Sequence, residues 1–240
     1  IVMNKLDATL DDVQNTRFGN IYHEFIRLMV RQTQFNEIEI TSILMIYHKF
    51  VLANGLRAKS MTKKQFFHLF EVLFRIYDLQ IIERILLNIT SGQKKEVDPV
   101  AWVKLFSVFM SSKLEPKMRF AFQVYDTHGM GTLNREIVTH AVEKFFNGDD
   151  EDEVNELRSV YDNNLIFKLL IFQDMIDLIF RKFDVDRDGL ISYDDYASVV
   201  VKDPLSLEFL GNCLPTTSGM TLTAYCANIM SQIMVSKANI

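Results

Sequence analysis

The sequence predicts an all-α protein made of two lobes, each built from helix–loop–helix units. Three observations carry this prediction: one acidic turn with metal-ligand spacing, apolar residues at helical intervals on both sides of it, and fainter upstream copies of the same arrangement. The composition agrees, because nineteen Phe and eleven Met stand against nine Gly, four Pro and one Trp. Such a balance suits helices with adaptable apolar surfaces better than a sheet.

The acidic turn runs from Asp184 to Asp195, with carboxylates at positions 1, 3 and 5 and Gly189 at position 6. This spacing is that of the twelve-residue EF-hand calcium loop. The predicted metal ligands are Asp184, Asp186, Asp188, the backbone carbonyl of Leu190, and Asp195. Position 12 normally holds a Glu, and Asp195 is one methylene shorter. We therefore expect one Ca²⁺ site that is weaker than usual and also accepts Mg²⁺.

The flanks of this turn predict two helices. The incoming apolar stripe is Ile176, Ile179, Phe180 and Phe183, and the outgoing one begins with Tyr196, Val199 and Val200. Ile191 at position 8 is expected to pair with the matching residue of a neighbouring loop. A solvated acidic turn needs none of these features, so an EF-hand is the better interpretation.

A second copy lies directly upstream, with its loop from Asp126 to Ile137 and Leu133 at position 8. Its incoming stripe is Met118, Ala121, Phe122 and Tyr125, and its outgoing one is Val138, Ala141 and Val142. Gly131 keeps the turn. His128, Met130 and Ile137 replace the oxygen ligands, so we expect a folded loop without a hard cation.

A third copy has its loop from Thr90 to Ala101, with Val97 at position 8. Lys94 and Lys95 stand at positions 5 and 6, and cationic side chains exclude a cation from this loop. Pro99 fits the preference of proline for the first turn of the next helix.

The earliest copy is the faintest. Its loop is three residues longer and separates a stripe ending at Phe50 from Met61 and Phe66. Basic residues replace the acidic ligands: Arg57, Lys59, Lys63 and Lys64. We interpret them as a solvated face, with a patch for an acidic partner as the alternative.

Two lobes follow from these copies, residues 20–111 and residues 112–204. An N-terminal extension, 1–19, precedes them, and a C-terminal tail, 205–240, follows. The acidic run at 148–153 is expected to be an exposed connection within the second lobe.

The tail carries no Asp, Glu, Lys or Arg from Phe209 to Ser236. Apolar residues recur in it at helical spacing: Leu222, Tyr225, Cys226, Ile229, Met230 and Ile233. Gly, Pro, Ser and Thr argue against a membrane span. We expect an amphipathic helix that covers its stripe in the groove of its own lobe, with another protein as the alternative.

The composition limits the classes of partner that we expect. A net charge of −5 gives no reason to expect nucleic acid. Cys213 and Cys226 are too few for a disulfide framework, so a reducing compartment is expected. No apolar run reaches the length of a membrane span, and no signal peptide is evident, so no membrane partner is expected.

An enzyme is not expected either. The sequence has no phosphate-cradling Gly-rich loop and no HExxH or CxxC pair. Histidines fall in helical stretches at His23, His48, His68 and His140, where we interpret them as groove or interface residues.

These features resemble the calaxins, the EF-hand calcium sensors of ciliary axonemes, over about residues 25–215. The resemblance is carried by the order of the units and by five segments: Gln34–Glu37, Phe66–Ile89, the hard turn Leu114–Met118, Phe183–Tyr196 with Asp at position 12, and Leu207–Pro215. More widely, the chain is similar to the neuronal calcium sensor and calcineurin B-like groups, which share the two-lobe plan.

The resemblance implies a place on the doublet microtubules of a cilium or flagellum, with the outer dynein arm docking complex, and control of dynein by calcium. The implied partners are proteins bound by helix-in-groove contacts, namely docking-complex coiled coils and axonemal microtubule-associated proteins. Only the metal role of the last loop carries over residue by residue. The calaxin pattern also has ligands in the second and third units, where this chain has Lys94, Lys95, Ala101, Met130 and Ile137.

Two other interpretations stay open. One is a purely structural component of the doublet microtubule that senses nothing. The other is a calcineurin B-like regulatory subunit, cytoplasmic rather than axonemal, that clasps one helix of a phosphatase or kinase.

Overall fold

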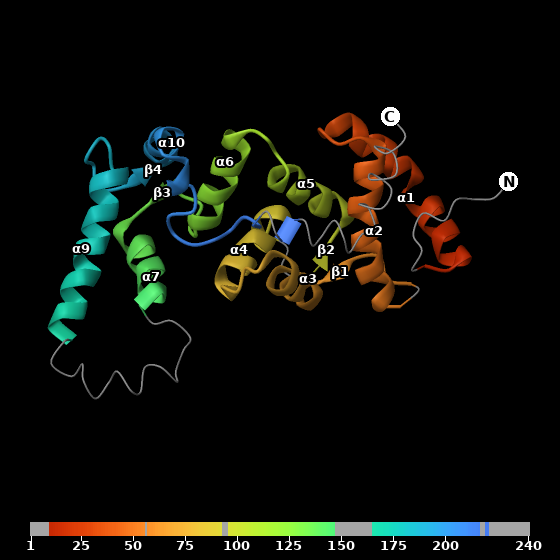
Figure 1. Cartoon of the computed structure of the whole chain (residues 1–240), viewed down its shortest axis with the longest axis horizontal. Helices are drawn as coiled ribbons and strands as arrows, with labels where there is room; N and C mark the ends of the chain where they lie inside the picture. Colours follow the sequence, from red (N-terminus) through yellow and green to blue (C-terminus); the bar gives the residue numbers. More distant parts are fainter. Residues whose placement is uncertain (1–9, 56, 93–95, 147–164, 217–218, 221–240) are drawn as a thin grey trace, which may run out of the picture. The chain divides into compact units, whose positions relative to one another are not determined.

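The computed structural model describes a chain of helices joined by loops, with strands of only two residues (Figure 1). The described residues are 10–55, 57–92, 96–146, 165–216 and 219–220, without the side chains of residues 145–146 and 165–168. The predicted all-α class is confirmed. Within this part of the chain, no helix combines the length and the apolar character that a membrane crossing requires.

The chain divides into two compact units. Unit 1 contains Ile1–Ser112 together with Leu214–Ile240, and unit 2 contains Lys113–Cys213. The chain therefore leaves unit 1 once and returns to it. Several predictions fall outside the described residues: Lys94 and Lys95, the acidic run at 148–153, and the tail helix at 222–233.

Unit 1 holds two helix–loop–helix units. Its helices are α1 (Asp12–Gln32), α2 (Glu37–Ala53), α3 (Lys63–Leu69), the π-helical turn η1 (Phe70–Phe74), α4 (Leu79–Ile89) and α5 (Pro99–Phe109). Strands β1 (Met61–Thr62) and β2 (Glu96–Val97) pair antiparallel, with Met61 opposite Val97. The two loops are thus joined at their position-8 residues, and Pro99 lies in the first turn of α5 as expected.

An aromatic core fills unit 1. Neighbouring rings in it are Trp102 and Phe106, Phe70 and Phe74, and Phe74 and Phe109, with centroids 4.8, 5.0 and 5.4 Å apart. The Trp102 Nε1 donates to the carbonyl of Ile43 at 2.9 Å, and the Tyr47 hydroxyl donates to the carbonyl of Val97 at 2.8 Å. These two bonds satisfy the polar ends of buried rings, so they fasten α2 to α5 and β2 without a desolvation penalty.

Helix α1 is an element that the sequence reading missed, since residue 20 was expected to begin the first unit. Asp11 caps it through a capping box, in which the Gln14 N–H donates to Asp11 Oδ1 at 2.7 Å. Four side chains on one face are buried: Phe18, Tyr22, Ile26 and Met29. Burial raises the pKa of Tyr22 to about 12. The capping box and this i, i+4, i+8, i+11 spacing were visible in the sequence.

Unit 2 repeats the plan of unit 1. Its elements are α6 (Leu114–Tyr125), β3 (Thr132–Leu133), α7 (Arg135–Phe146), α9 (Leu165–Phe183), β4 (Ile191–Ser192), α10 (Tyr193–Lys202) and the 3₁₀ turn η2 (Pro204–Ser206). Leu133 lies opposite Ile191 in the β3–β4 pair, which confirms the predicted pairing of the loops. Arg135 at the start of α7 forms an ion pair with Asp177 of α9, and its hydrogen bond lowers the pKa of that carboxyl.

The prediction of a hard turn at Leu114–Met118 is wrong, because these residues form the first turn of α6. Pro116 is compatible with that turn. The backbone N–H groups at a helix start have no intrahelical acceptor, so a proline there costs no hydrogen bond.

Unit 2 continues beyond residue 204, where the sequence reading ended the lobe. Phe209 stacks on Phe183 with ring centroids 4.0 Å apart, and the Tyr196 hydroxyl donates to the carbonyl of Leu207 at 2.7 Å. The Tyr125 hydroxyl likewise donates to the carbonyl of Gly211 at 2.7 Å. These contacts hold the first residues of the predicted tail on the aromatic core of unit 2.

His48 is a core residue of unit 1, with a side chain only 2% exposed. Its ring lies edge-on to Phe18 and Tyr22 of α1, at centroid distances of 5.4 and 5.5 Å. Neither ring nitrogen has a hydrogen-bond partner among the described residues. Burial, together with the nearby charge of Arg17, lowers the pKa of His48, so the α1–α2 interface requires a neutral imidazole.

We predict that unit 1 loses stability in mild acid. The unfolded chain binds a proton at His48 below about pH 6.5, whereas the folded chain resists it, so stability falls as pH drops through that value, by at most about 1.4 kcal/mol per pH unit. Urea unfolding followed by Trp102 fluorescence at several pH values measures this. His48→Phe should flatten the profile, and His140→Gln in unit 2 should leave it unchanged. An unaltered profile in His48→Phe would contradict the prediction.

Candidate metal centre

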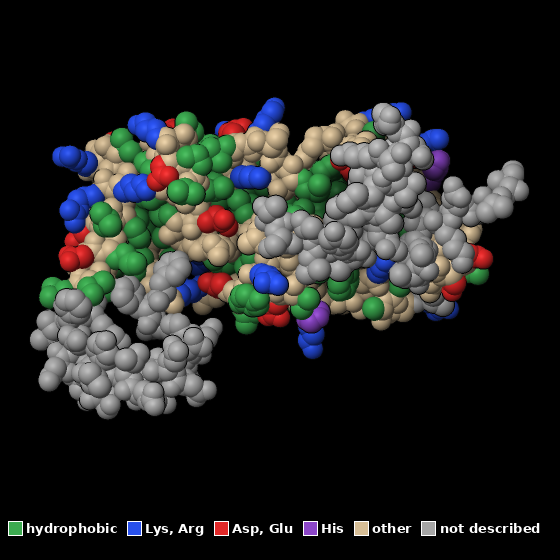
Figure 2. Space-filling view, in the orientation of Figure 1, with side chains coloured by type: hydrophobic (Ala, Val, Ile, Leu, Met, Phe, Trp, Pro, Cys, Tyr) green, Lys and Arg blue, Asp and Glu red, His purple; other side chains and the backbone are tan. Residues whose placement is uncertain are grey.

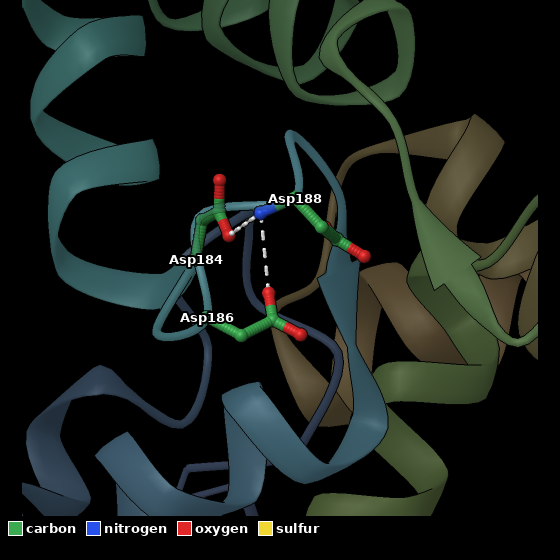
Figure 3. Close-up of side chains that lie close together, drawn as sticks. All are labelled: Asp184, Asp186 and Asp188. Atoms are coloured by element: carbon green, nitrogen blue, oxygen red, sulfur yellow. Dashed lines mark hydrogen bonds between the residues drawn. The ribbon is translucent and has the colours of Figure 1, made fainter.

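The loop between α9 and β4 brings three predicted ligands together. One carboxylate oxygen from each of Asp184, Asp186 and Asp188 lies within 4.8 Å of the others (Figure 3). Figure 3 shows the Asp184 and Asp186 carboxylates both directed at the backbone nitrogen of Asp188. In the part of the chain that the structure describes, this is the only such group of potential metal ligands.

Backbone hydrogen bonds hold this loop in shape. The N–H of Asp188 donates to Asp184 Oδ1 at 3.1 Å, and the N–H of Gly189 donates to Asp184 Oδ2 at 3.0 Å. Arg187 and Gly189 have positive φ values of 63° and 86°. Glycine adopts this conformation without steric cost, which explains why position 6 holds Gly189.

Leu190 lies directly before β4. Its N–H donates to Asp188 Oδ1 at 2.8 Å. The ligand predicted from Leu190 is its backbone carbonyl, so the exposure of its side chain does not bear on that role.

Asp195 occupies a different place from the other predicted ligands. It lies in the first turn of α10, its side chain is buried, and it is outside the three-carboxylate group. Its Oδ2 accepts hydrogen bonds from the Ser192 N–H at 3.0 Å and from the Ser192 hydroxyl at 2.5 Å. The Ser192 Oγ in turn accepts from the Asp195 N–H at 3.1 Å, which completes a capping box.

The donors present fit a hard divalent cation. Three carboxylates held within 4.8 Å repel one another, and a cation among them converts that repulsion into attraction. Oxygen-only donors select Ca²⁺ or Mg²⁺ over softer metals. Asp184, Asp186, Asp188 and the Leu190 carbonyl would hold the ion, with Asp195 joining only after it leaves its cap.

The loop between α6 and β3 has the same scaffold without the ligands. Its first residue, Asp126, accepts from the N–H groups of Met130 at 3.0 Å and Gly131 at 2.7 Å. Both bonds have the same loop positions as those made by Asp184. Gly129 matches Arg187 with a φ of 63°. The predicted folded but ligand-poor loop thus keeps the backbone conformation that binding would need.

A helix cap at position 9 is common to the four loops, and the sequence reading did not single it out. In each loop the position-9 side chain accepts from the position-12 N–H: Thr62 from Gln65, Asp98 from Ala101, Asn134 from Ile137, and Ser192 from Asp195. The signal was available, because Ser, Thr, Asp and Asn are the residues that cap helices. These caps start the outgoing helices without help from a metal.

Comparisons with known proteins agree with this geometry. Residues 115–201 match the EF-hand domain pair, a calcium-binding arrangement. Calaxin of Xenopus laevis is 26% identical over 184 residues, covering 75% of this chain and 82% of the relative. Calaxin of Homo sapiens is 24% identical over 186 residues, covering 75% and 81%. Guanylyl cyclase-activating protein 2 of Gallus gallus is 24% identical over 180 residues, covering 72% and 83%.

The chain contains an EF-hand domain pair and is similar to the calaxins. The matched pair, residues 115–201, contains both the acidic loop and the ligand-poor loop that pairs with it. The similarity to the calaxins extends further, over three quarters of the chain. The calaxin resemblance inferred from sequence motifs is thereby confirmed.

We predict that Asp195→Glu tightens calcium binding by this calaxin-like chain. The added methylene lets both carboxylate oxygens reach the ion, so the Ca²⁺ affinity should rise about tenfold, or about 1.4 kcal/mol, with a smaller change for Mg²⁺. Isothermal titration calorimetry measures both affinities. Asp194→Glu adds the same methylene at the exposed neighbouring position and should change neither. Equal effects of the two substitutions would argue against a ligand role for position 12.

We also predict that ligands alone can restore the neighbouring loop. The combined substitutions His128→Asp, Met130→Asp and Ile137→Glu place oxygens on a backbone that already has the required shape. Native mass spectrometry should then show one more bound calcium than in the unmodified chain. Adding Asp126→Ala, which removes the acceptor for the N–H groups of Met130 and Gly131, should abolish the gain. No added ion in the triple variant would show that the scaffold is insufficient.

Proposed function

We propose that this chain is a calcium-responsive adaptor of the ciliary or flagellar axoneme, associated with outer dynein arm docking on doublet microtubules. The observation that carries the proposal is the converged carboxylate group of Asp184, Asp186 and Asp188 in a chain similar to the calaxins over most of its length. The related guanylyl cyclase-activating protein also points to a regulatory rather than a catalytic role.

Asp195 is the residue that would transmit the signal. It belongs to α10 and accepts hydrogen bonds from the N-cap residue Ser192, while its place in the loop sequence is that of the last ligand. A bound calcium ion supplies an attraction for this carboxylate. The Asp195 carboxylate can either keep its hydrogen bonds from Ser192 or approach the ion in the loop. If it approaches the ion, it draws the start of α10 towards Asp184. Such a movement changes the angle between α9 and α10, which is the usual switch of an EF-hand sensor.

Helical segments of other proteins are the proposed partners, in particular coiled coils of a docking complex and axonemal microtubule-associated proteins. Unit 2 exposes large apolar side chains, among them Leu178 and Val201 at 60% and 63%. Figure 2 shows hydrophobic side chains interspersed with charged ones on the visible face of this unit. Such a surface fits an amphipathic helix better than nucleic acid, which the net charge of −5 also disfavours.

A purely structural role is the second candidate, and one observation favours it. Within each unit, the position-9 caps and the paired loops hold the helices in place without any ion. With one cation-binding loop, the switching free energy is limited to what a single site can supply. In this second candidate, calcium would stabilise unit 2 and leave its helices in place.

A calcium titration followed by amide NMR on the full chain separates the two roles. A sensor should show shifts spread over unit 2, including α6 and α7, because the helices reorient. Shifts confined to the acidic loop, or none, would favour the structural role. The variant Asp184→Asn, Asp186→Asn serves as the control and should remove every calcium-dependent shift.

The proposed localisation to the axoneme needs a separate test. We expect the chain to remain with axonemes after the ciliary membrane is removed by detergent. Recovery in the cytosolic fraction with a phosphatase or kinase would instead support a calcineurin B-like subunit.

A further inference from the structure

The loop between α2 and β1 contains a serine side chain that joins the two loops of unit 1. The Ser60 hydroxyl donates a hydrogen bond to Glu96 Oε2 in β2. Ser60 lies directly before β1, whose Thr62 is opposite Glu96 in the strand pair. The hydroxyl therefore adds a side-chain contact beside the backbone pairing of Met61 with Val97.

The sequence around Ser60 has a charge pattern that one class of enzyme recognises. Arg57 is the only Arg in the whole sequence that stands three residues before a Ser or Thr. Basophilic protein kinases select substrates by charge and bind an Arg at this position through acidic side chains of their own. Lys59, Lys63 and Lys64 add positive charge on both sides of the serine. The basic residues of this loop thus fit recognition by a kinase.

The segment that carries Ser60 is accessible and weakly held. Arg57 and Lys59 are exposed, and Ser60 itself is half-buried. Two hydrogen bonds to its backbone are long: the Tyr47 hydroxyl lies 3.3 Å from the Lys59 carbonyl oxygen. The Asn54 Nδ2 lies 3.5 Å from the carbonyl oxygen of Ser60. Long bonds cost little free energy to break, so the segment can open locally for a kinase while the helices stay folded.

We propose that Ser60 is a phosphorylation site for a basophilic protein kinase, and that its phosphorylation loosens the β1–β2 pair of unit 1. In the transfer, Ser60 Oγ forms a bond to the γ-phosphorus of ATP, the bond from that phosphorus to the bridging oxygen breaks, and ADP leaves. The hydroxyl proton passes to the catalytic Asp of the kinase. This inference goes beyond the proposed calcium response, because it concerns unit 1 and requires no ion in the acidic loop.

The added phosphate opposes the contact that Ser60 makes. It removes the hydroxyl donor and brings a charge of about −1.5 to −2 at pH 7 next to the Glu96 carboxylate. Like charges at this distance repel, although Glu96 is exposed, so that water and salt limit the repulsion. The Ser60–Glu96 contact is therefore lost, and the Met61–Val97 pair beside it opens more often. Because that pair links the two helix–loop–helix units, the modification acts on the joint between them.

Incubation of the full chain with ATP and the catalytic subunit of cyclic AMP-dependent protein kinase tests recognition. Mass spectrometry of the digested protein should place the phosphate at Ser60. Arg57→Gln should slow the incorporation at least about tenfold, because it removes the charge that the kinase binds. Lys59→Gln is the matched control: it removes the same charge from an exposed neighbouring position and should have a much smaller effect.

Hydrogen exchange of the phosphorylated chain, followed by mass spectrometry, tests the consequence. The amide groups of β1 and β2 should exchange about fivefold faster than in the unmodified chain, because their pairing opens more often. Those of β3 and β4 in unit 2 are the internal control and should not change. Glu96→Gln removes the opposing charge but keeps an oxygen acceptor for the Ser60 hydroxyl. Phosphorylation of this variant should accelerate exchange much less.

Three results would overturn the proposal. The first is a chain that takes up no phosphate at Ser60. The second is equal incorporation in Arg57→Gln and Lys59→Gln, which would make the basic loop a general patch for an acidic partner. The third is unchanged exchange of β1 and β2 after phosphorylation, or equal acceleration in Glu96→Gln. None of these measurements depends on calcium, so failure here is distinct from failure of the calcium response.

Discussion

The pairing of loops in twos is the constraint on which the rest of the structure depends. Met61 lies opposite Val97 in unit 1, and Leu133 lies opposite Ile191 in unit 2. All four residues are fully buried. Each pair links two helix–loop–helix units through their loops, and the apolar faces of the incoming and outgoing helices close over a shared core. A single unit could not bury its own stripe, and its helices alone would be marginal in water.

The loops joined in this way are shaped by hydrogen bonds within the protein itself. Asp126 organises its loop with the same two backbone bonds that Asp184 makes in the acidic loop. The bonds accepted by Asp126 belong to a loop in which His128 and Met130 stand at ligand positions. The backbone scaffold of these loops therefore does not depend on which side chains stand at the ligand positions.

Most of the fold could be predicted from the sequence, because it depends on residue types with few alternative roles. The stripe around Trp102, the turn at Gly189 and the position-8 pairs each had one consistent interpretation. Helix α1 was not predicted because it lies outside the repeated helix–loop–helix unit. His48 was misjudged for a different reason: a histidine on an apolar stripe looks the same in sequence whether it faces a groove or the core, and only the edge-on rings of Phe18 and Tyr22 decide. Asp195 can serve as the acceptor for Ser192 in the capping box or as a metal ligand, and sequence spacing alone does not decide between these two roles.

That competition defines how the acidic loop can act. The capping box gives Asp195 two hydrogen bonds from Ser192, an arrangement worth about 1 kcal/mol at a helix start. With Asp195 kept in its cap, an ion in the loop relies on Asp184, Asp186 and Asp188, and α10 keeps its place. With Asp195 turned to the ion, its two hydrogen bonds from Ser192 are lost, and the first turn of α10 moves towards the loop. A Glu at this position could reach further with less movement of the backbone. The shorter aspartate therefore couples any ligation by position 12 more directly to displacement of the helix, at the expense of affinity.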